Sequence, residues 1–342
     1  MVSSQACRGR LAVLGAGSWG TALSMVLAGA GWRVALWARR PAVAEAIQRD
    51  RRNPAYLSQF ELPERIGATA ELPAAVAGAE LVVLAVPSAG MAEVCRGLAG
   101  LLAPDQGLVN AAKGLEPETG RRLSQVIETA LRPHWQGPLA ALSGPNLAPE
   151  VAAGLAAAAV VACADGAFAR RVQAALSTPR FRVYTNPDAI GVELGGALKN
   201  IIAIGAGASD GLGFGENAKA ALLTRGLTEI TRLGVALGAR KETLRGLSGM
   251  GDLVATCAGR QSRNHRVGYE LAQGRRLPEI LADMGQVAEG VDTTRAARRL
   301  AAQTGVEMPI TEAVHALLFE ALPAADAVRA LMARAWRDEL EP

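Results

Sequence analysis

The feature that most constrains this chain is a trio of glycines near its start. A short apolar run at residues 11–14 reads as a buried strand, and Gly15, Gly17 and Gly20 follow it at G-x-G-x-x-G spacing. A helical stretch at 21–30 comes next. The motif requires this order of strand, glycines and helix, so we predict a dinucleotide-binding turn.

Each glycine has a physical role in such a turn. Gly15 permits the tight passage from strand to helix, Gly17 lets the backbone approach a pyrophosphate, and Gly20 lets the helix pack closely on the strand. The N–H groups at the start of the helix then face the anion with the positive end of the helix dipole behind them.

Strand-like and helical segments alternate along the first half of the chain. The apolar runs that we read as strands are 11–14, 34–37, 81–86, 107–111, 139–142, 157–162 and 181–184. The helical stretches between them include 41–51, 91–101, 121–131 and 167–176. This alternation predicts a Rossmann-type, doubly wound α/β fold with a mainly parallel sheet and helices on both faces.

After Pro187 the strand signal stops. Helical stretches follow at 188–208, 217–237, 241–247, 264–273, 277–284, 293–304, 311–319 and 324–336, with Thr311 as a candidate N-cap. We therefore predict a dinucleotide-binding domain at 1–187 and an all-helical substrate and catalytic domain at 188–342. A cleft between the two is expected.

Composition narrows the class of protein. The chain has 342 residues, half of them apolar, and a net charge of +4, and its arginines are scattered, which argues against a nucleic-acid partner. The cysteines Cys7, Cys95, Cys163 and Cys257 form no C-x-x-C pair, so we expect no metal and a reduced, cytoplasmic location. The longest apolar run that we find, 155–164, is too short to span a bilayer. A homodimer is one candidate assembly.

Lysine is rare in this chain, at positions 113, 199, 219 and 241 among 36 lysines and arginines. Unlike arginine, lysine can lose its proton near neutral pH when its pKa is depressed. Lys199 lies in an otherwise apolar helix with small neighbours, where burial is expected to lower its pKa. A lysine that snorkels to the surface is the alternative. We favour a functional lysine because unpaired lysines are seldom buried.

Two polar segments stand out in the helical half. Residues 248–252 read as a glycine loop that delivers the carboxylate of Asp252, although Asp252 is also a candidate helix N-cap. Ser262, Arg263 and Asn264 stand at a helix start. A hydroxyl, a guanidinium and an amide there suit an anion, and a capping box is the alternative.

The end of the second strand carries two arginines, Arg39 and Arg40. An NAD enzyme usually has an Asp or Glu there, roughly 20 residues after the glycine motif, to bind the ribose 2′-hydroxyl. This chain has no acid until Glu45. Because the arginine fork matches a 2′-phosphate, we predict that NADPH is preferred, with Arg39 as main contact and Arg40 assisting, and that NAD is also usable. A merely solvated arginine pair is the alternative.

Together these motifs resemble the prokaryotic NAD(P)-dependent glycerol-3-phosphate dehydrogenase family. The resemblance covers nearly the whole chain, through 15–21 (GAGSWGT), 112–116 (AKGLE), 143–145 (SGP), 195–200 (GGALKN), 251–253 (GDL), 262–264 (SRN) and 287–290 (VAEG). It implies reversible reduction of dihydroxyacetone phosphate to sn-glycerol 3-phosphate, the backbone of phospholipids. It also implies that Lys199 is the proton donor and acceptor.

The resemblance implies further site residues. The family's substrate contacts fall here on Lys113, Gly144, Asp252, Ser262, Arg263 and Asn264. Its cofactor contacts fall on Ser18, Trp19, Arg39, Lys113, Ala148, Arg263, Val287 and Glu289, which implies a cofactor held between the domains. Where the family usually has Ser or Thr and then Phe, this chain has Asn146 and Leu147. Asn146 can still hydrogen-bond a substrate oxygen through its longer side chain.

The chemistry expected at this site agrees with the residues. An ammonium near the C2 carbonyl stabilises the charge that develops on oxygen and supplies the proton. Lys113, if it faces the same site, would depress the pKa of Lys199 by repulsion, and Asp252 would orient one of the two lysines.

Two other functions stay open at this point. Dehydrogenases of 3-hydroxy acids or of ketopantoate also join this fold to a helical domain, but they need a carboxylate site rather than a phosphate site. A non-catalytic NADP sensor would need the glycine motif and would have no use for Lys199 or Asp252.

Overall fold

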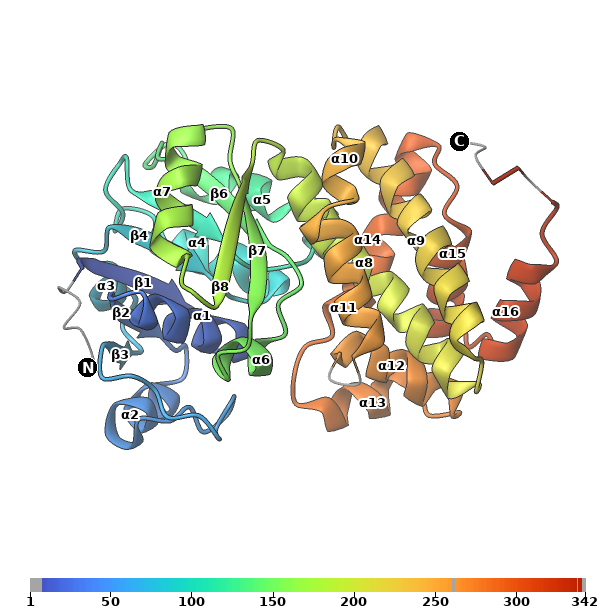
Figure 1. Cartoon of the computed structure of the whole chain (residues 1–342), viewed down its shortest axis with the longest axis horizontal. Helices are drawn as coiled ribbons and strands as arrows, with labels where there is room; N and C mark the ends of the chain where they lie inside the picture. The colour runs from blue at the N-terminus through green and yellow to red at the C-terminus, as the bar shows by residue number, and fades with distance from the viewer. Residues whose placement is uncertain (1–7, 260–261, 337, 340–342) are drawn as a thin grey trace. The chain divides into compact units, whose positions relative to one another are not determined.

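The first half of the chain forms one eight-stranded sheet (Figure 1). The structure is a computed structural model that describes residues 8–259, 262–336 and 338–339, so Cys7 lies outside the described residues. The strands are β1 (Arg10–Leu14), β2 (Arg33–Trp37), β3 (Ile66–Thr69), β4 (Leu81–Leu84), β5 (Gly107–Asn110), β6 (Leu139–Ser143), β7 (Ala157–Ala162) and β8 (Phe181–Asn186). Their order is β3-β2-β1-β4-β5-β6-β7-β8, and only the β6–β7 pair is antiparallel. The expected mainly parallel, doubly wound sheet is confirmed.

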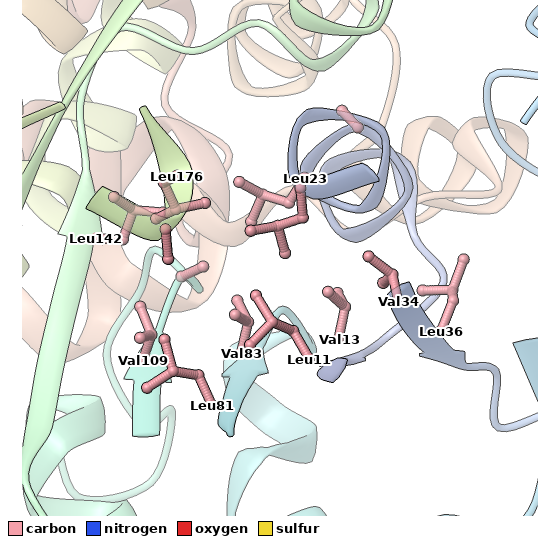
Figure 2. Packing of buried hydrophobic residues seen from close by; sticks show 14 of the residues in the cluster. Leu11, Val13, Leu23, Val34, Leu36, Leu81, Val83, Val109, Leu142 and Leu176 are labelled. Carbon is pink, nitrogen blue, oxygen red and sulfur yellow. The ribbon is translucent and has the colours of Figure 1, made fainter. Parts of the chain in front are cut away.

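Both faces of the inner strands of the sheet are buried because these strands are almost wholly apolar. Successive side chains of a strand point to opposite faces, so β1 sends Leu11 and Val13 into one core and Ala12 and Leu14 into the other. Figure 2 shows the first core, where Leu23 from the helix after β1 packs with leucines and valines of the neighbouring strands. Continuous apolar strands of this kind are typical of a parallel sheet covered by helices on both sides.

Short helical elements connect the strands. They are α1 (Ser18–Gly29), α2 (Pro41–Asp50), α3 (Leu72–Val76), the 3-10 turn η1 (Ser88–Gly90), α4 (Met91–Leu98), α5 (Leu123–Leu131), α6 (Ala148–Ala152) and α7 (Gly166–Leu176). The helix that we expected to begin at residue 121 begins at Leu123, because Arg121 and Arg122 belong to a hairpin described below.

The chain divides into two compact units, and one short segment from the first half of the chain belongs to the second unit. The first unit contains the chain up to Ala112 together with Leu123–Ala189, and the second contains Lys113–Arg122 and the chain from Ile190 onward. In the segment that we call the 113–122 hairpin, Leu115 and Arg122 face each other as an antiparallel bridge. A single boundary at Pro187 therefore leaves out ten residues that pack with the second unit.

The second unit is helical apart from this hairpin. Its elements are α8 (Ala189–Gly211), α9 (Glu216–Ala236), α10 (Lys241–Leu244), the π-helical turn η2 (Leu247–Gly251), α11 (Asp252–Ala258), α12 (Arg263–Ala272), α13 (Leu277–Met284), α14 (Glu289–Thr304), α15 (Pro309–Phe319) and α16 (Ala324–Met332). Among the described residues, α8 alone is long and apolar enough to cross a membrane, which the sequence reading overlooked. However, 83% of its most apolar window is buried in the protein, as in the core helix of a folded domain.

The predicted N-cap of the helix at 311–319 is wrong. Thr311 does not cap α15, whose N-cap is Met308, and lies inside the helix. The carboxylate of the buried Glu229 on α9 instead accepts hydrogen bonds from the backbone N–H groups of Ile310 and Thr311, at 2.6 and 3.1 Å. A side chain 82 residues away thus satisfies the free N–H groups of α15, so no capping signal was needed in the local sequence.

Candidate active site

The three glycines after β1 form the expected turn. Gly15 has φ +116°, and a Cβ placed on it would lie 2.5 Å from the carbonyl oxygen of Ala85, which follows β4. A Cβ on Gly20 would lie 1.9 Å from the oxygen of Gly15, whereas a Cβ on Gly17 would meet nothing within 4 Å. Gly15 and Gly20 are therefore required by the packing of the turn, and Gly17 keeps open the space beside the backbone.

The start of α1 is suited to an anion. Its N-cap is Gly17, which has no side chain to accept a hydrogen bond from the first turn, and that turn begins with Ser18 and Trp19. The N–H groups of a first turn have no partner within the helix, and the helix dipole favours negative charge there. The turn also lies where β1 adjoins β4, the point at which the strand order reverses and at which ligands of such sheets bind.

A buried asparagine that sequence reasoning missed supports the turn. Asn53, in the loop after α2, donates from its side-chain amide to the oxygen of Ala16 and to the hydroxyl oxygen of Thr21, both at 2.9 Å. Its own side-chain oxygen accepts from the N–H groups of Ala55 and Tyr56. A polar residue in an irregular loop gives no periodic signal, so only the fold reveals this role.

The ends of two other strands in the first unit carry predicted site residues. Arg39 and Arg40 are exposed just after β2, at the same edge of the sheet as the glycine turn. After β6, Gly144 has φ +139°, and Asn146 donates from Nδ2 to the oxygen of Ala158 at 2.9 Å.

This hydrogen bond fixes which way the Asn146 amide faces. Because a carbonyl oxygen accepts from Nδ2, the oxygen Oδ1 must point away from β7, and no described group binds it although it is buried. The hydroxyl of Ser143 is likewise buried without a partner among the described residues. Buried acceptors normally have partners, so the end of β6, next to Ala148 at the start of α6, offers hydrogen-bonding capacity to a ligand.

The lysine that we singled out lies at the centre of a charged cluster in the second unit. Lys199, midway along α8, is 6% exposed, and its Nζ donates to Oδ1 of Asp252 at 2.8 Å and to Oγ1 of Thr256 at 2.6 Å. Lys113, on the 113–122 hairpin, donates to the other oxygen of Asp252 at 2.8 Å. Asp252 therefore orients both lysines, where we had expected it to orient one.

The electrostatics of this cluster favour proton transfer. The pKa of Lys199 is lowered to about 8, because burial and the positive charge of Lys113 together outweigh the opposing charge of Asp252. Burial works to raise the pKa of Asp252, but the charges of Lys113 and Lys199 hold that pKa below its ordinary value. Asp252 thus remains ionised while Lys199 can gain and lose a proton near neutral pH.

Small residues allow this cluster to form. The segment that we expected to be a glycine loop is the π-helical turn η2, which leads directly into α11 at Asp252. A Cβ on Gly195 of α8 would lie 2.9 Å from the backbone oxygen of Ser248, and one on Gly249 would lie 1.8 Å from the oxygen of Leu244. The backbones of α8, α10 and η2 approach so closely only because these positions are glycine.

Thr256 is a member of the cluster that sequence reasoning missed. It lies four residues after Asp252, so both side chains project from the same face of α11 toward Lys199. The i, i+4 spacing was present in the sequence, but residues 252–258 had not been assigned to a helix.

At the start of α12 the structure shows the capping that we weighed as the alternative, and anion binding there stays a prediction. Ser262 caps the helix by accepting from the N–H of His265 at 3.3 Å. Asn264 donates to Oδ1 of Asn200, the neighbour of Lys199, at 2.8 Å, and accepts from the N–H of Gly290 at 2.9 Å. Arg263 is exposed between these two buried residues.

Asn264 thereby links three segments of the second unit that carry predicted site residues. It joins the start of α12 to α8 beside Lys199 and to the start of α14, where Glu289 is the first residue. Val287, just before α14, is 45% exposed. The structure thus brings the predicted residues of the second unit to a few neighbouring elements, and it places those of the first unit along one edge of the sheet.

Comparison with known proteins identifies relatives along nearly the whole chain. Residues 10–169 match the N-terminal and residues 188–329 the C-terminal model of NAD-dependent glycerol-3-phosphate dehydrogenase. Proteins named glycerol-3-phosphate dehydrogenase [NAD(P)+] are similar: that of Moorella thermoacetica is 53% identical over 97% of this chain and 98% of its own length, and that of Symbiobacterium thermophilum is 52% identical over 97% and 96%. The crystal structure of glycerol-3-phosphate dehydrogenase from Coxiella burnetii has a TM-score of 0.91 and 42% identity, covering 96% of this chain and 99% of its own.

Proposed function

This chain belongs to the NAD-dependent glycerol-3-phosphate dehydrogenase family, and we propose that it interconverts dihydroxyacetone phosphate and sn-glycerol 3-phosphate with NAD(P)H or NAD(P)+. The observation that carries the proposal is the Lys199–Asp252–Lys113 cluster, in which a buried ammonium has a pKa of about 8. A site with such a proton donor is what a ketone reductase needs, and a cofactor sensor would have no use for it.

The residues of the glycine turn fit a dinucleotide. The space beside Gly17 is open, and the first turn of α1 has no side-chain cap, so its N–H groups suit a pyrophosphate. When bound, the nicotinamide supplies hydride for reduction and takes hydride in oxidation. We assign cofactor binding to Gly15, Gly17, Ser18, Trp19, Gly20, Arg39, Arg40, Lys113, Ala148, Arg263, Val287 and Glu289.

Lys199 acts as the general acid of reduction. Its ammonium stabilises the negative charge that develops on the C2 oxygen of the ketone and then donates the proton to that oxygen. In the reverse direction the neutral amine of Lys199 accepts the proton of the C2 hydroxyl. Asp252 and Thr256 hold the Nζ in place at 2.8 and 2.6 Å, so little reorganisation is needed at the moment of transfer.

The phosphate of the substrate binds at the start of α12. Arg263 is exposed there and supplies the charge, while the buried Ser262 and Asn264 hold the first turn of the helix in position. Lys113, Gly144 and Asn146 complete the substrate contacts, with Oδ1 of Asn146 as an acceptor for a substrate hydroxyl. A phosphate-binding arginine favours this substrate over the 3-hydroxy acids and ketopantoate considered above.

We assign the preferred cofactor as NADPH, with NADH as a poorer one. Arg39 and Arg40 are exposed after β2, and the first acid beyond them is Glu45. A ribose 2′-phosphate would accept charge-assisted hydrogen bonds from these guanidinium groups, whereas a 2′-hydroxyl finds no carboxylate there.

The cellular role that fits this activity is the supply of glycerol 3-phosphate for phospholipid synthesis. We assign the protein to the cytoplasm, in keeping with Cys95, Cys163 and Cys257, which are free thiols in the described part of the chain. A homodimer stays one candidate assembly, to be checked by sedimentation.

A rate assay tests the proposed function. The purified protein is given dihydroxyacetone phosphate with NADPH, and the loss of nicotinamide absorbance is followed. Dihydroxyacetone and ketopantoate serve as controls that lack the phosphate. We expect rapid turnover of dihydroxyacetone phosphate alone. Equal rates with ketopantoate, or cofactor binding without turnover of any ketone, would refute the proposal.

A further inference from the structure

The 113–122 hairpin is the part of the second unit that brings Lys113 to the site. It leaves the sheet after β5 and returns at α5, yet it packs with the helical unit. Leu115 pairs with Arg122 across the hairpin, and the N–H of Glu116 donates to the oxygen of Arg121 at 2.9 Å. The two arms of the hairpin are therefore paired at Leu115, two residues after Lys113. Because of this pairing, a displacement of Arg122 would also displace Lys113.

Three contacts anchor this hairpin to the helices. Leu115 is 1% exposed within the core of the second unit. The oxygen of Pro117 accepts a hydrogen bond from the guanidinium of Arg299 on α14. Arg122 forms an ion pair with Glu193 of α8, with Nη1 and Oε2 2.8 Å apart.

The ion pair is the anchor with a direct connection to the site. The side chains of Arg122 and Glu193 are only 21% and 5% exposed, so the pair is largely shielded from water. Glu193 lies six residues before Lys199 on α8, a rise of about 9 Å along the helix. One helix thus supplies Lys199 and also holds the hairpin that supplies Lys113.

We propose that Arg122 and Glu193 are positioning residues that hold Lys113 against Asp252 and so keep both lysines on one carboxylate. The proposal deepens the proposed function and rests on it for its catalytic meaning. Neither residue is asked to touch substrate or cofactor. Their role is to fix the distance between the two ammonium groups that share Asp252.

Loss of the ion pair has a defined electrostatic consequence. The charged and titratable groups that act on Lys199 are Asp252, Lys113 and the thiol of Cys257, whose pKa is raised by burial to about 12. If Lys113 moves away, its repulsion weakens, and Asp252 then pairs with Lys199 alone. Both changes raise the pKa of Lys199.

The titration of Lys199 can be measured without any substrate. Because the chain has lysine only at 113, 199, 219 and 241, protein labelled with ¹³C at lysine Cε gives four signals, which single Lys→Arg variants assign. In the wild type we expect the Lys199 signal to titrate near pH 8. In Glu193→Gln we expect this midpoint to rise by at least about half a pH unit, because a like charge has moved away. The double variant Arg122→Glu/Glu193→Arg should restore the ion pair and return the Lys199 midpoint to its wild-type value.

A matched variant separates the ion pair from the rest of the hairpin. Arg121→Gln removes the ion pair between Arg121 and Glu116, which lies within the hairpin and does not reach α8, so it should leave the Lys199 midpoint unchanged. If Glu193→Gln does not fold, Arg122→Gln removes the same ion pair through its more exposed partner. The same rise in the Lys199 midpoint is then expected.

The proposal is overturned if a folded Glu193→Gln or Arg122→Gln variant titrates at Lys199 as the wild type does, or if Arg121→Gln shifts the midpoint equally. A reversed pair that leaves the shift in place would also contradict it. Failure of the proposed function would show differently, as a wild-type protein with the expected titration and no turnover of dihydroxyacetone phosphate.

Discussion

The glycine turn and the lysine cluster are built in opposite ways. The turn uses backbone N–H groups within six consecutive positions, 15–20, where the important property of a residue is the absence of a side chain. The cluster uses side chains from positions 113, 199, 252 and 256, which a hairpin and two helices bring together. We therefore expect the glycine turn to be sensitive to side-chain volume. The lysine cluster, whose residues are far apart in the sequence, should instead be sensitive to charge and protonation.

The largest expected effect comes from the cluster. Lys199→Arg keeps the positive charge but offers no proton near neutral pH, so turnover should fall at least about a hundredfold while NADPH affinity stays nearly intact. The same substitution at the exposed Lys241 should change neither quantity. If turnover of the arginine variant were within a few-fold of the wild type, Lys199 would not be the proton donor and acceptor.

The next effect concerns phosphate. Arg263→Ala should weaken the use of dihydroxyacetone phosphate by tens of fold, about the value of one or two charge-assisted hydrogen bonds, and leave the poor activity on dihydroxyacetone little changed. Arg266→Ala, which removes an exposed arginine paired with Glu270 on the same helix, is the control. Equal losses on both substrates would place Arg263 elsewhere, and NADPH affinity measured on the same variant shows whether the cofactor also needs it.

The glycine turn should respond to volume. Gly20→Ala would place a Cβ 1.9 Å from the oxygen of Gly15, so we expect a loss of about 1–3 kcal/mol in stability and a weakening of NADPH binding of about tenfold. Gly29→Ala lies on the same helix with nothing within 4 Å of its Cβ, and it should be neutral or stabilise by up to about 1 kcal/mol. Calorimetry and cofactor titration distinguish the two. Equal behaviour of both variants would mean that Gly20 is not needed for close packing.

The smallest effect is the choice of cofactor. We expect catalytic efficiency to favour NADPH over NADH by about tenfold, because two charge-assisted bonds at an exposed site are weakened by solvent. The double variant Arg39→Ala/Arg40→Ala should lose this preference, and Arg49→Ala, in the last turn of α2, should keep it. An unchanged preference in the double variant would show that the two arginines do not bind the 2′-phosphate.

The sequence predicted the parts of the fold that have strong periodic signals and missed the short ones. Strand β3 has only one buried residue, Ile66, among Gly67, Ala68 and Thr69, so it lacks the apolar run of the inner strands. Helices α3 and α6 have five residues each, too few to show a helical period. Helix α11 was missed because the glycines of η2 before it read as a loop.

The cluster was predictable where the sequence itself is unusual, as for the rare lysines and for Asp252, which follows a segment with two glycines. Thr256, Asn53 and Glu193 were not predicted, because nothing in their local sequence marks them and only their partners in space give them a role. The 113–122 hairpin shows the same limit, since nothing in its local pattern says that it packs with the helical unit.

The pH dependence of the reaction in both directions tests the central claim most directly. If Lys199 is the acid–base residue that we propose, it must carry its proton for reduction and must have lost it for oxidation, and its pKa is about 8. The account predicts that kcat/KM for reduction of dihydroxyacetone phosphate falls as pH rises through about 8, that kcat/KM for oxidation of glycerol 3-phosphate rises over the same range, and that Lys199→Arg abolishes both transitions. Transitions in the same direction, or transitions that persist in the arginine variant, would contradict it.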